Sequence, residues 1–140
     1  MQGLMAAVIG ATMIATCAPL PRDPDGTLDR IQREGRFTVG RVAGATDAAG
    51  MRVLADVARA TGARPVVRSG QLEPLLLDLE EGRLDLVVGG RFDAKTPWAT
   101  RVTLGPPLDE GAHREHIVAR NGENAWIMLV ERAARAEGGA

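Results

Sequence analysis

The sequence is poor in the side chains that carry most enzyme chemistry and most disulfide scaffolds. Its 140 residues contain one cysteine, two histidines, no tyrosine and 3% aromatic residues. A single cysteine excludes an internal disulfide. The one serine, Ser69, lies outside any Gly-x-Ser-x-Gly turn, which presents the nucleophile in many hydrolases. No glycine-rich phosphate loop follows the first expected strand. We therefore expect neither an enzyme nor a bound cofactor.

The charge balance argues against another class of function. The formal net charge is −1 and the isoelectric point is about 6.1, so the chain has no electrostatic reason to bind nucleic acid. His113 and His116 lie in a polar stretch without a third ligand at a defined spacing, and we expect no metal site there. Hydrophobic residues make up 45% of the chain, which suffices for one compact domain.

An uncharged apolar stretch near the start of the chain leads to the single cysteine. Leu4–Thr16 (LMAAVIGATMIAT) is too short to span a bilayer comfortably and is typical of a secretory signal. Ile14-Ala15-Thr16-Cys17 resembles a bacterial lipobox, in which the cysteine is lipidated. We interpret residues 1–17 as a signal peptide with a lipobox and residues 18–26, rich in proline, as an extended tether. A plain secretory signal and an uncleaved anchor are the alternatives.

Residues 27–136 alternate between helical and extended patterns. Such alternation predicts an α/β lobe with a mostly parallel sheet flanked by helices. Residues 137–140 are expected to be a disordered tail. Helices are predicted at 27–34 with Thr27 as N-cap, after Asp47 as far as Gly62, at 72–81, and around 126–133; strands are predicted at 36–42, 64–68, 84–88 and 116–120, with a short extended piece at 102–104.

The stretch Leu72–Pro97 carries the clearest indication of a binding site. It reads as an amphipathic helix, a stop at Gly82, a buried apolar strand, and a Gly-Gly-Arg turn that opens a polar loop. In open α/β sheets, ligands bind in the crevice beyond the carboxyl ends of the strands. We therefore expect a site formed by the loops around Gly89–Thr96.

Four segments in order resemble type 2 periplasmic substrate-binding proteins, especially the family 3 solute-binding proteins of amino-acid ABC transporters. GTLDRIQREGRFTVGRV resembles the start of the mature proteins, and EPLLLDLEEGRLDLVVGG resembles their helix followed by a G-x-x-D-x-x-x-G strand. Thr96-Pro97 and Leu104–Leu108 fall where the family has a Thr-led loop and an aromatic-Ser-x-Pro-Tyr segment. EHIVARNGENAWIMLVERAAR resembles the return strand and final helix. The resemblance covers roughly residues 26–136.

Departures from the family pattern are equally informative. Only Asp109–Glu115 stands where the family builds a second lobe, so the resemblance implies a single lobe. Hinge closure between two lobes holds the ligand in such proteins, and a lone lobe lacks it. Amino-acid binders of the family carry an arginine three residues after the threonine, which pairs with the substrate carboxylate; Ala99 stands there. Arg41–Gly50 contains no aromatic residue to cradle a substrate.

The resemblance implies a transporter-associated solute-binding protein of the periplasm, lipid-anchored through Cys17. Its expected partners are a small polar solute and an inner-membrane transporter. The alternative is an accessory subunit that kept the fold, lost ligand binding and docks on a membrane transport complex. A homo-oligomer is also considered, because Pro106–Leu108 could form an apolar patch. The candidate ligand-binding residues are Arg41, Gly90, Arg91, Thr96 and Trp98. In the alternative interpretation, the two arginines are solvated charges and Gly90 permits a tight turn. Thr96 then caps a loop, and Trp98 covers the edge of the core.

Replacing the single cysteine tests the anchor. Cys17→Ser should release the protein from the membrane fraction into the soluble envelope fraction, because the acyl chains that hold it would no longer be attached. Fractionation followed by immunoblotting measures this. An unchanged distribution of the variant would contradict lipidation at Cys17.

Overall fold

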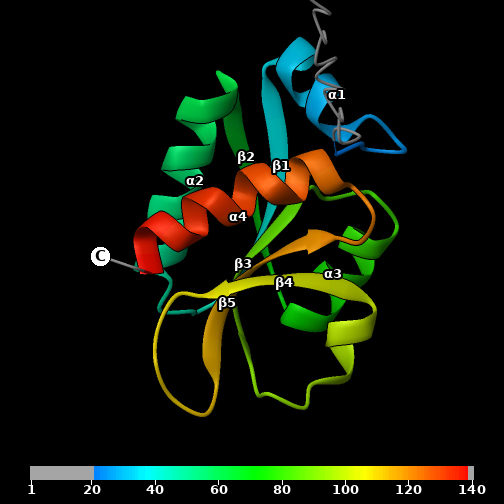
Figure 1. Cartoon of the computed structure of the whole chain (residues 1–140). Helices are drawn as coiled ribbons and strands as arrows, with labels where there is room; N and C mark the ends of the chain where they lie inside the picture. Colours follow the sequence, from blue (N-terminus) through cyan, green and yellow to red (C-terminus); the bar gives the residue numbers. More distant parts are fainter. Residues whose placement is uncertain (1–20, 139–140) are drawn as a thin grey trace, which may run out of the picture.

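The computed structural model describes residues 21–138, so Cys17 and the first part of the expected tether lie outside the described residues. Helices and strands alternate along the chain (Figure 1). The elements are α1 (Thr27–Glu34), β1 (Arg36–Val42), α2 (Ala48–Thr61), β2 (Arg64–Gly70), α3 (Leu72–Glu80), β3 (Leu86–Phe92), the 3-10 helix η1 (Pro97–Thr100), β4 (Val102–Pro107), β5 (Arg114–Arg120) and α4 (Asn124–Gly138).

A five-stranded sheet in the order β2-β1-β3-β5-β4 forms the centre of the lobe. β1 pairs in parallel with both β2 and β3, whereas β5 runs antiparallel to β3 and to β4. Four of the five strands therefore point the same way, with β5 as the exception. The predicted α/β lobe with a mostly parallel sheet flanked by helices is confirmed.

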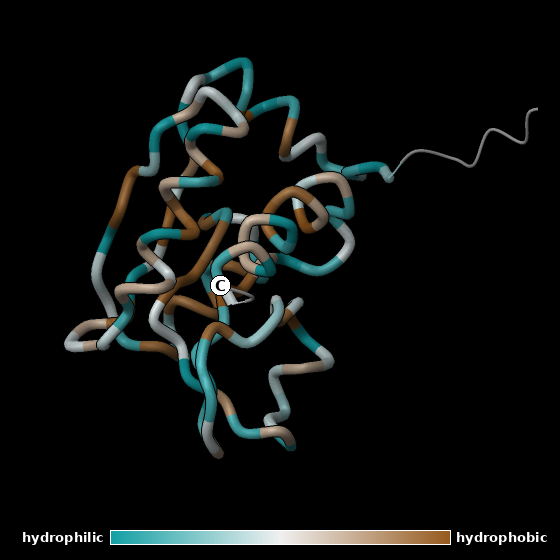
Figure 2. Tube along the Cα trace, turned by 60° about the vertical axis from the view of Figure 1, so that its left-hand side comes forward, coloured by the Kyte–Doolittle hydropathy of each residue, from teal (hydrophilic) through white to brown (hydrophobic). Residues whose placement is uncertain are grey.

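Two hydrophobic clusters cover the two faces of the sheet. Leu86 and Val88 of β3 face the larger cluster, to which α1, α2 and α4 contribute, and Val87 faces the smaller cluster beneath α3. Hydrophobic residues accordingly follow the strands and the inner faces of the helices (Figure 2). Trp126 of α4 is 1% exposed and packs edge-on against Phe37, as expected of a core tryptophan.

The start of α1 differs from the prediction. The N-cap is Gly26, and Thr27 is the first helical residue and is buried. Gly26 has no side chain to cap the helix, so acceptors from outside the helix take that part. Asp23 Oδ2 accepts the Leu28 N–H at 2.9 Å, and Glu123 Oε2 accepts the Thr27 N–H at 3.3 Å. These long-range acceptors satisfy N–H groups that a helix leaves unpaired at its start.

The predicted Gly-Gly turn is wrong. Gly89 and Gly90 lie inside β3, which continues to Phe92. The register of β3 against β5 shifts between Val87 and Gly90, and Gly89 has φ +80°, so the pair forms a β-bulge. A Cβ on Gly89 would lie 2.8 Å from Ala45 Cβ. The glycines therefore serve a bent strand and a close approach of the neighbouring loop.

Other boundaries also extend beyond the sequence expectation. β2 continues to Gly70, and the short extended piece expected at residues 102–104 is the full strand β4, which ends at Pro107. α4 runs to Gly138, into the segment 137–140 where a disordered tail is expected, and Glu137 forms an ion pair with Arg52 of α2. Gly82, by contrast, follows the end of α3 with φ +77°, as the stop signal predicts.

A charge in the middle of β3 should abolish the fold. Leu86 is fully buried, and an unpaired carboxylate there costs several kcal/mol, comparable with a total stability of roughly 5–15 kcal/mol. We expect Leu86→Asp to lose cooperative melting in circular dichroism. The control is Arg83→Ala, whose exposed ion pairs with Asp78 and Glu81 contribute about 0–1 kcal/mol. A cooperatively melting Leu86→Asp protein would show that β3 is not central.

Candidate functional site

The predicted site residues gather at the carboxyl edge of the sheet but on both of its faces. Arg41 near the end of β1 and Arg91 near the end of β3 interact with acids on the side of α2. Thr96 lines a cleft on the opposite side, where Phe92 joins the cluster beneath α3. Gly90 lies in the bulge of β3, where a Cβ would collide with the Phe92 ring. The structure therefore brings these residues to one edge without joining them in one pocket.

Arg41 is engaged by a buried carboxylate. Its Nε and Nη2 donate to the two Asp47 oxygens at 2.7 and 2.9 Å, a bidentate geometry with strong directional preference. Asp47 is 4% exposed, and its hydrogen bonds and charge raise the pKa of Arg41. Asp47 occupies the N-cap position of α2 without capping it through its side chain. The Asp47 side chain, which the sequence predicts to cap α2, forms the ion pair with Arg41 instead.

Arg91 is paired with the β4–β5 loop through a single guanidinium nitrogen, in a more exposed pair than that of Arg41. It forms an ion pair with Asp109 Oδ2, while Asp109 Oδ1 accepts the Glu115 N–H at 2.8 Å. The Glu115 N–H and then the Arg91 guanidinium lower the pKa of Asp109. The short β4–β5 loop is thus tied to β3. Each of the two predicted arginines is therefore already paired with an acid of the lobe.

Glu115, the second residue of β5, is a buried acid that sequence reasoning did not assign to the site. It is 3% exposed, and its Oε1 accepts the Gly50 N–H in the first turn of α2 at 3.2 Å. Burial raises the pKa of this carboxyl, and the nearby charges of Asp109 and Asp47 raise it further. Its position in the sequence, in an acidic loop, gave no sign of burial.

A cleft of about 360 Å³ lies on the other face of this edge. It extends between the loop after β3, the 3-10 helix η1, and the loop that joins β4 to β5. Thr96, just before η1, and Ala99, within η1, line one part of the cleft. The strands contribute Phe92, Pro107, Arg114 and His116. This is the cleft beyond the strand ends in which an α/β sheet is expected to bind ligands.

The polar groups of the cleft are oriented by local hydrogen bonds. His116 Nδ1 lies 2.7 Å from the Gly105 carbonyl oxygen, and its ring packs edge-on against Phe92. Arg114 Nε donates to the Gly111 carbonyl at 3.2 Å. Its two terminal nitrogens form no hydrogen bond within residues 21–138. The Thr96 oxygen accepts the Trp98 N–H at 3.4 Å. A small polar solute would meet an imidazole, a hydroxyl and a guanidinium here.

Trp98 does not line the cleft. Its ring lies 4.3 Å from the guanidinium carbon of Arg101 and packs against the cluster beneath α3. It covers the edge of the core, which is the alternative role considered from the sequence. Thr96 caps η1, as one of its expected roles requires, and it also lines the cleft.

Within residues 21–138, no three His, Cys, Asp or Glu side chains are arranged to hold a metal ion. The helices described there are all too short or too polar to cross a bilayer.

The comparisons with known proteins identify the fold. No family model matches the chain, and no curated protein matches its sequence. Among solved structures, the arginine-bound form of domain 1 from TmArgBP is similar at a TM-score of 0.66 and 16% identity, over 77% of this chain and 98% of that one. A substrate-binding protein of a Streptococcus pneumoniae amino-acid ABC transporter, bound to L-arginine, gives 0.67 and 8%, over 78% and 90%. A further amino-acid ABC transporter substrate-binding protein gives 0.63 and 7%, over 75% and 96%.

These similarities show that the chain has the fold of a single periplasmic-binding-protein lobe, as expected from the sequence. The neighbours are binding proteins of amino-acid transporters. Domain 1 of TmArgBP is in its arginine-bound form in that structure.

The buried acid gives the lobe a pH-dependent stability. Because the folded state raises the Glu115 pKa above its ordinary 4.5, the folded state favours the protonated form. The contribution of Glu115 to the free energy of unfolding is therefore present below pH 4.5. It is lost as the pH rises through the raised pKa of the folded state. Glu115→Gln keeps an acceptor oxygen for the Gly50 N–H without the charge.

We expect Glu115→Gln to match the wild type near pH 4 and to become increasingly more stable than it toward pH 7, measured by urea unfolding at each pH. Glu110→Gln, on the exposed part of the same loop, is the control and should show no such divergence. A difference between wild type and Glu115→Gln that stays constant with pH would mean that Glu115 ionises in the fold without cost.

Proposed function

We propose that this protein is a single-lobe solute-binding protein of the bacterial envelope that works with a membrane transporter and is lipid-anchored through Cys17 on the periplasmic side. The carboxyl-edge cleft is the binding site, and its ligand is a small polar solute. The lobe acts by binding and not by catalysis. The fold of its structural neighbours supports this reading, as does the lipobox-like sequence.

The cleft beside Thr96 and Ala99 is the observation that carries the proposal. Its volume of about 360 Å³ is at the lower end of the range for small-molecule sites, about 300–1,000 Å³. It lies at the edge of the sheet where α/β folds bind ligands. The Arg114 guanidinium and the His116 ring offer polar contacts, while Phe92 and Pro107 offer apolar ones.

Free amino acids should bind this cleft weakly. Ala99 stands where relatives carry the arginine that pairs with the ligand carboxylate, and Arg41 and Arg91 are held by Asp47 and Asp109. A bidentate guanidinium–carboxylate pair is among the strongest polar contacts available. Without it, and without a second lobe to enclose the ligand, we expect a dissociation constant of about 1 mM or weaker.

Restoring the missing guanidinium tests the site. Ala99 is exposed and lines the cleft, so Ala99→Arg should fold and place a guanidinium where a carboxylate can reach it. We expect amino acids to bind at least about tenfold more tightly to Ala99→Arg than to the wild type, since a charge-assisted hydrogen bond contributes about 1.5–3 kcal/mol. Calorimetric titration with a panel of amino acids measures this.

Two controls make the result specific. Ala99→Gln fills similar space without the charge, and Ala60→Arg adds the same charge on α2, far from the cleft. Neither should improve binding. Equal gains from Ala60→Arg, or no binding by Ala99→Arg to any member of the panel, would contradict the cleft as the binding site.

The alternative is an accessory subunit that kept the lobe and docks on a membrane transport complex. One observation favours it. The two arginines at the strand ends form ion pairs within the lobe, so they stabilise its loops and are not kept for a ligand. This reading expects no solute binding by the wild type and co-purification of a transport protein from detergent extracts. A solute that binds the wild-type cleft at micromolar concentration would exclude it.

A further inference from the structure

The end of the lobe opposite the cleft is tied to the chain that leads to Cys17. Asp23 Oδ1 accepts the N–H groups of Ala125 and Trp126 at 2.7 and 3.1 Å, and its other oxygen accepts the Leu28 N–H. One carboxylate thereby caps the starts of both α4 and α1. The Arg22 carbonyl oxygen accepts the Asn124 N–H at 3.1 Å. Residues 22 and 23 are therefore bonded to the lobe.

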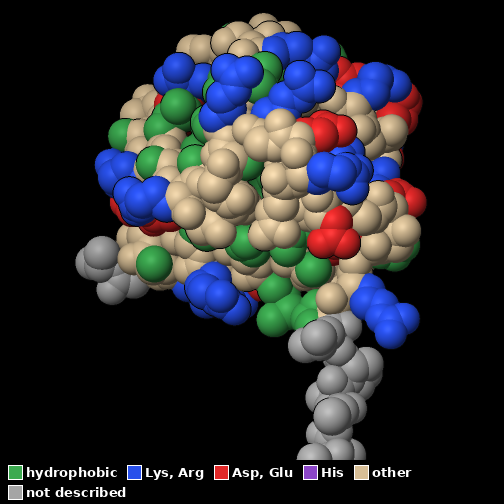
Figure 3. Space-filling model, turned by 90° about the horizontal axis from the view of Figure 1, so that it is seen from above, with side chains coloured by type: hydrophobic (Ala, Val, Ile, Leu, Met, Phe, Trp, Pro, Cys, Tyr) green, Lys and Arg blue, Asp and Glu red, His purple; other side chains and the backbone are tan. Residues whose placement is uncertain are grey.

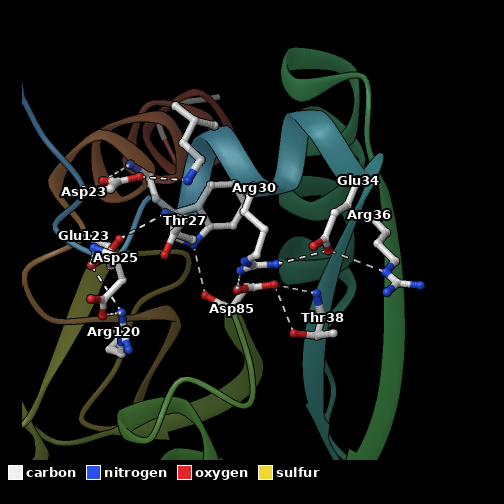
Figure 4. A network of polar contacts seen from close by, with 12 residues as sticks. Asp23, Asp25, Thr27, Arg30, Glu34, Arg36, Thr38, Asp85, Arg120 and Glu123 are labelled. Carbon is white, nitrogen blue, oxygen red and sulfur yellow. Dashed lines mark hydrogen bonds and ion pairs between the residues drawn. The ribbon is translucent and has the colours of Figure 1, made fainter.

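A second acid completes this clamp. Glu123 is 2% exposed, and its oxygens accept the N–H groups of Asp25 and Thr27 at 3.1 and 3.3 Å (Figure 4). Burial alone would raise the pKa of Glu123, but hydrogen bonds from Thr27 and Asp25 and the charge of Arg120 lower it. Glu123 is therefore held as an acceptor. Only residues 18–21 remain as a spacer between the clamp and Cys17.

So short a spacer keeps one end of the lobe close to the anchor. The five residue steps from Cys17 to Arg22 span at most about 18 Å. Pro21 lies beside Leu28 and Asp29 of α1 in a shallow surface hollow. α1 is about 12 Å long and ends next to the first residue of β1. The described chain thus enters the lobe at the end where the amino edge of the sheet lies (Figure 1).

This amino edge carries exposed arginines from four elements. They are Arg33 at the end of α1, Arg36 at the start of β1, Arg59 in the last turn of α2 and Arg64 at the start of β2. Seen from this end, basic side chains outnumber acidic ones (Figure 3). Arg33 and Arg64 form no ion pair within residues 21–138, and Arg36 has a partner only at 3.8 Å, in Glu34. Arg59 is 75% exposed and pairs with Asp56 of the same helix.

Helix electrostatics explain only half of this set. Arginines in the last turns of α1 and α2 are favourable next to the negative helix ends. Arg36 and Arg64, however, are register partners on adjacent parallel strands, and like charges directly opposite each other destabilise a sheet. Val66, two residues beyond Arg64, is also 43% exposed. An anionic partner at the amino edge would relieve the repulsion between Arg36 and Arg64.

We propose that the amino edge of the sheet lies against an anionic phospholipid membrane, with Arg33, Arg36, Arg59 and Arg64 contacting lipid phosphates. The proposal rests on lipidation at Cys17 for the approach to the membrane and on the clamp for the orientation. A lipid anchor combined with a basic surface is a recognised way to hold a protein on a bilayer. Because the cleft lies at the opposite edge of the sheet, it opens away from the lipid toward dissolved solute.

Vesicle flotation tests the basic surface apart from the anchor. The full chain carrying Cys17→Ser is mixed at low salt with phosphatidylcholine vesicles, with or without phosphatidylglycerol. We expect binding that requires phosphatidylglycerol and falls as salt is added. Each arginine near the membrane should contribute roughly fivefold, so Arg36→Gln with Arg64→Gln should lower the partition coefficient roughly 25-fold. The control pair, Arg52→Gln with Arg135→Gln near the start of α2 and the end of α4, removes the same charge away from the amino edge and should have little effect.

The orientation has its own readout. Because Cys17 is the only cysteine, Cys17→Ser with Gln32→Cys or with Glu110→Cys carries one fluorophore at the amino edge or at the cleft edge. A lipid-phase quencher should quench the label at position 32 and spare the one at position 110.

Equal losses from the two arginine pairs, binding that ignores phosphatidylglycerol, or equal quenching at both labels would overturn the proposal. Selective binding to a membrane protein without lipid dependence would do so as well, in favour of a protein partner. Failure of lipidation or of solute binding would appear instead in the fractionation of Cys17→Ser or in the titrations of Ala99→Arg, which this assay does not involve.

Discussion

Strand β3 has apolar side chains on both faces, and both must be covered at the same time. Leu86, Val87 and Val88 are completely buried, and they alternate between the cluster under α2 and α4 and the cluster under α3. Losing either layer would expose a full row of valine and leucine side chains to water. β1 and β5 pair with β3, and β2 and β4 pair with these two strands. The burial of β3 therefore positions the whole sheet, with its amino edge and its carboxyl edge.

The two edges have different chemistry because the strands are mostly parallel. At the carboxyl edge, loops rich in small and polar residues surround the cleft, and Gly89 lets the loop carrying Ala45 approach β3 closely. At the amino edge, α1 and α2 end, and the clamp of Asp23 and Glu123 fastens the incoming chain. The proposed attachment and the proposed ligand site therefore lie at opposite ends of one small lobe.

The use of arginine differs between these edges. Arg41 and Arg91 at the carboxyl edge are paired with Asp47 and Asp109, and these pairs tie two loops to the strand ends. The Arg41–Asp47 pair, with its buried carboxylate, gives geometric definition more than net stability. At the amino edge, Arg36 and Arg64 are register partners on adjacent strands. The nearest acid to Arg36 is Glu34, at 3.8 Å, so this pair of arginines is less neutralised than Arg41 and Arg91.

The sequence by itself determined the order and type of the elements, the mostly parallel lobe and several helix ends. These follow from signals confined to a few residues, such as the leucine spacing of α3 and the glycine after it. Only the tertiary structure decided that Gly89 and Gly90 form a bulge, that Arg41 and Thr96 face opposite sides of the sheet, and that Asp23 caps a helix 102 residues away in the chain. Those features depend on strand pairing and on contacts between distant residues, which local periodicity does not encode.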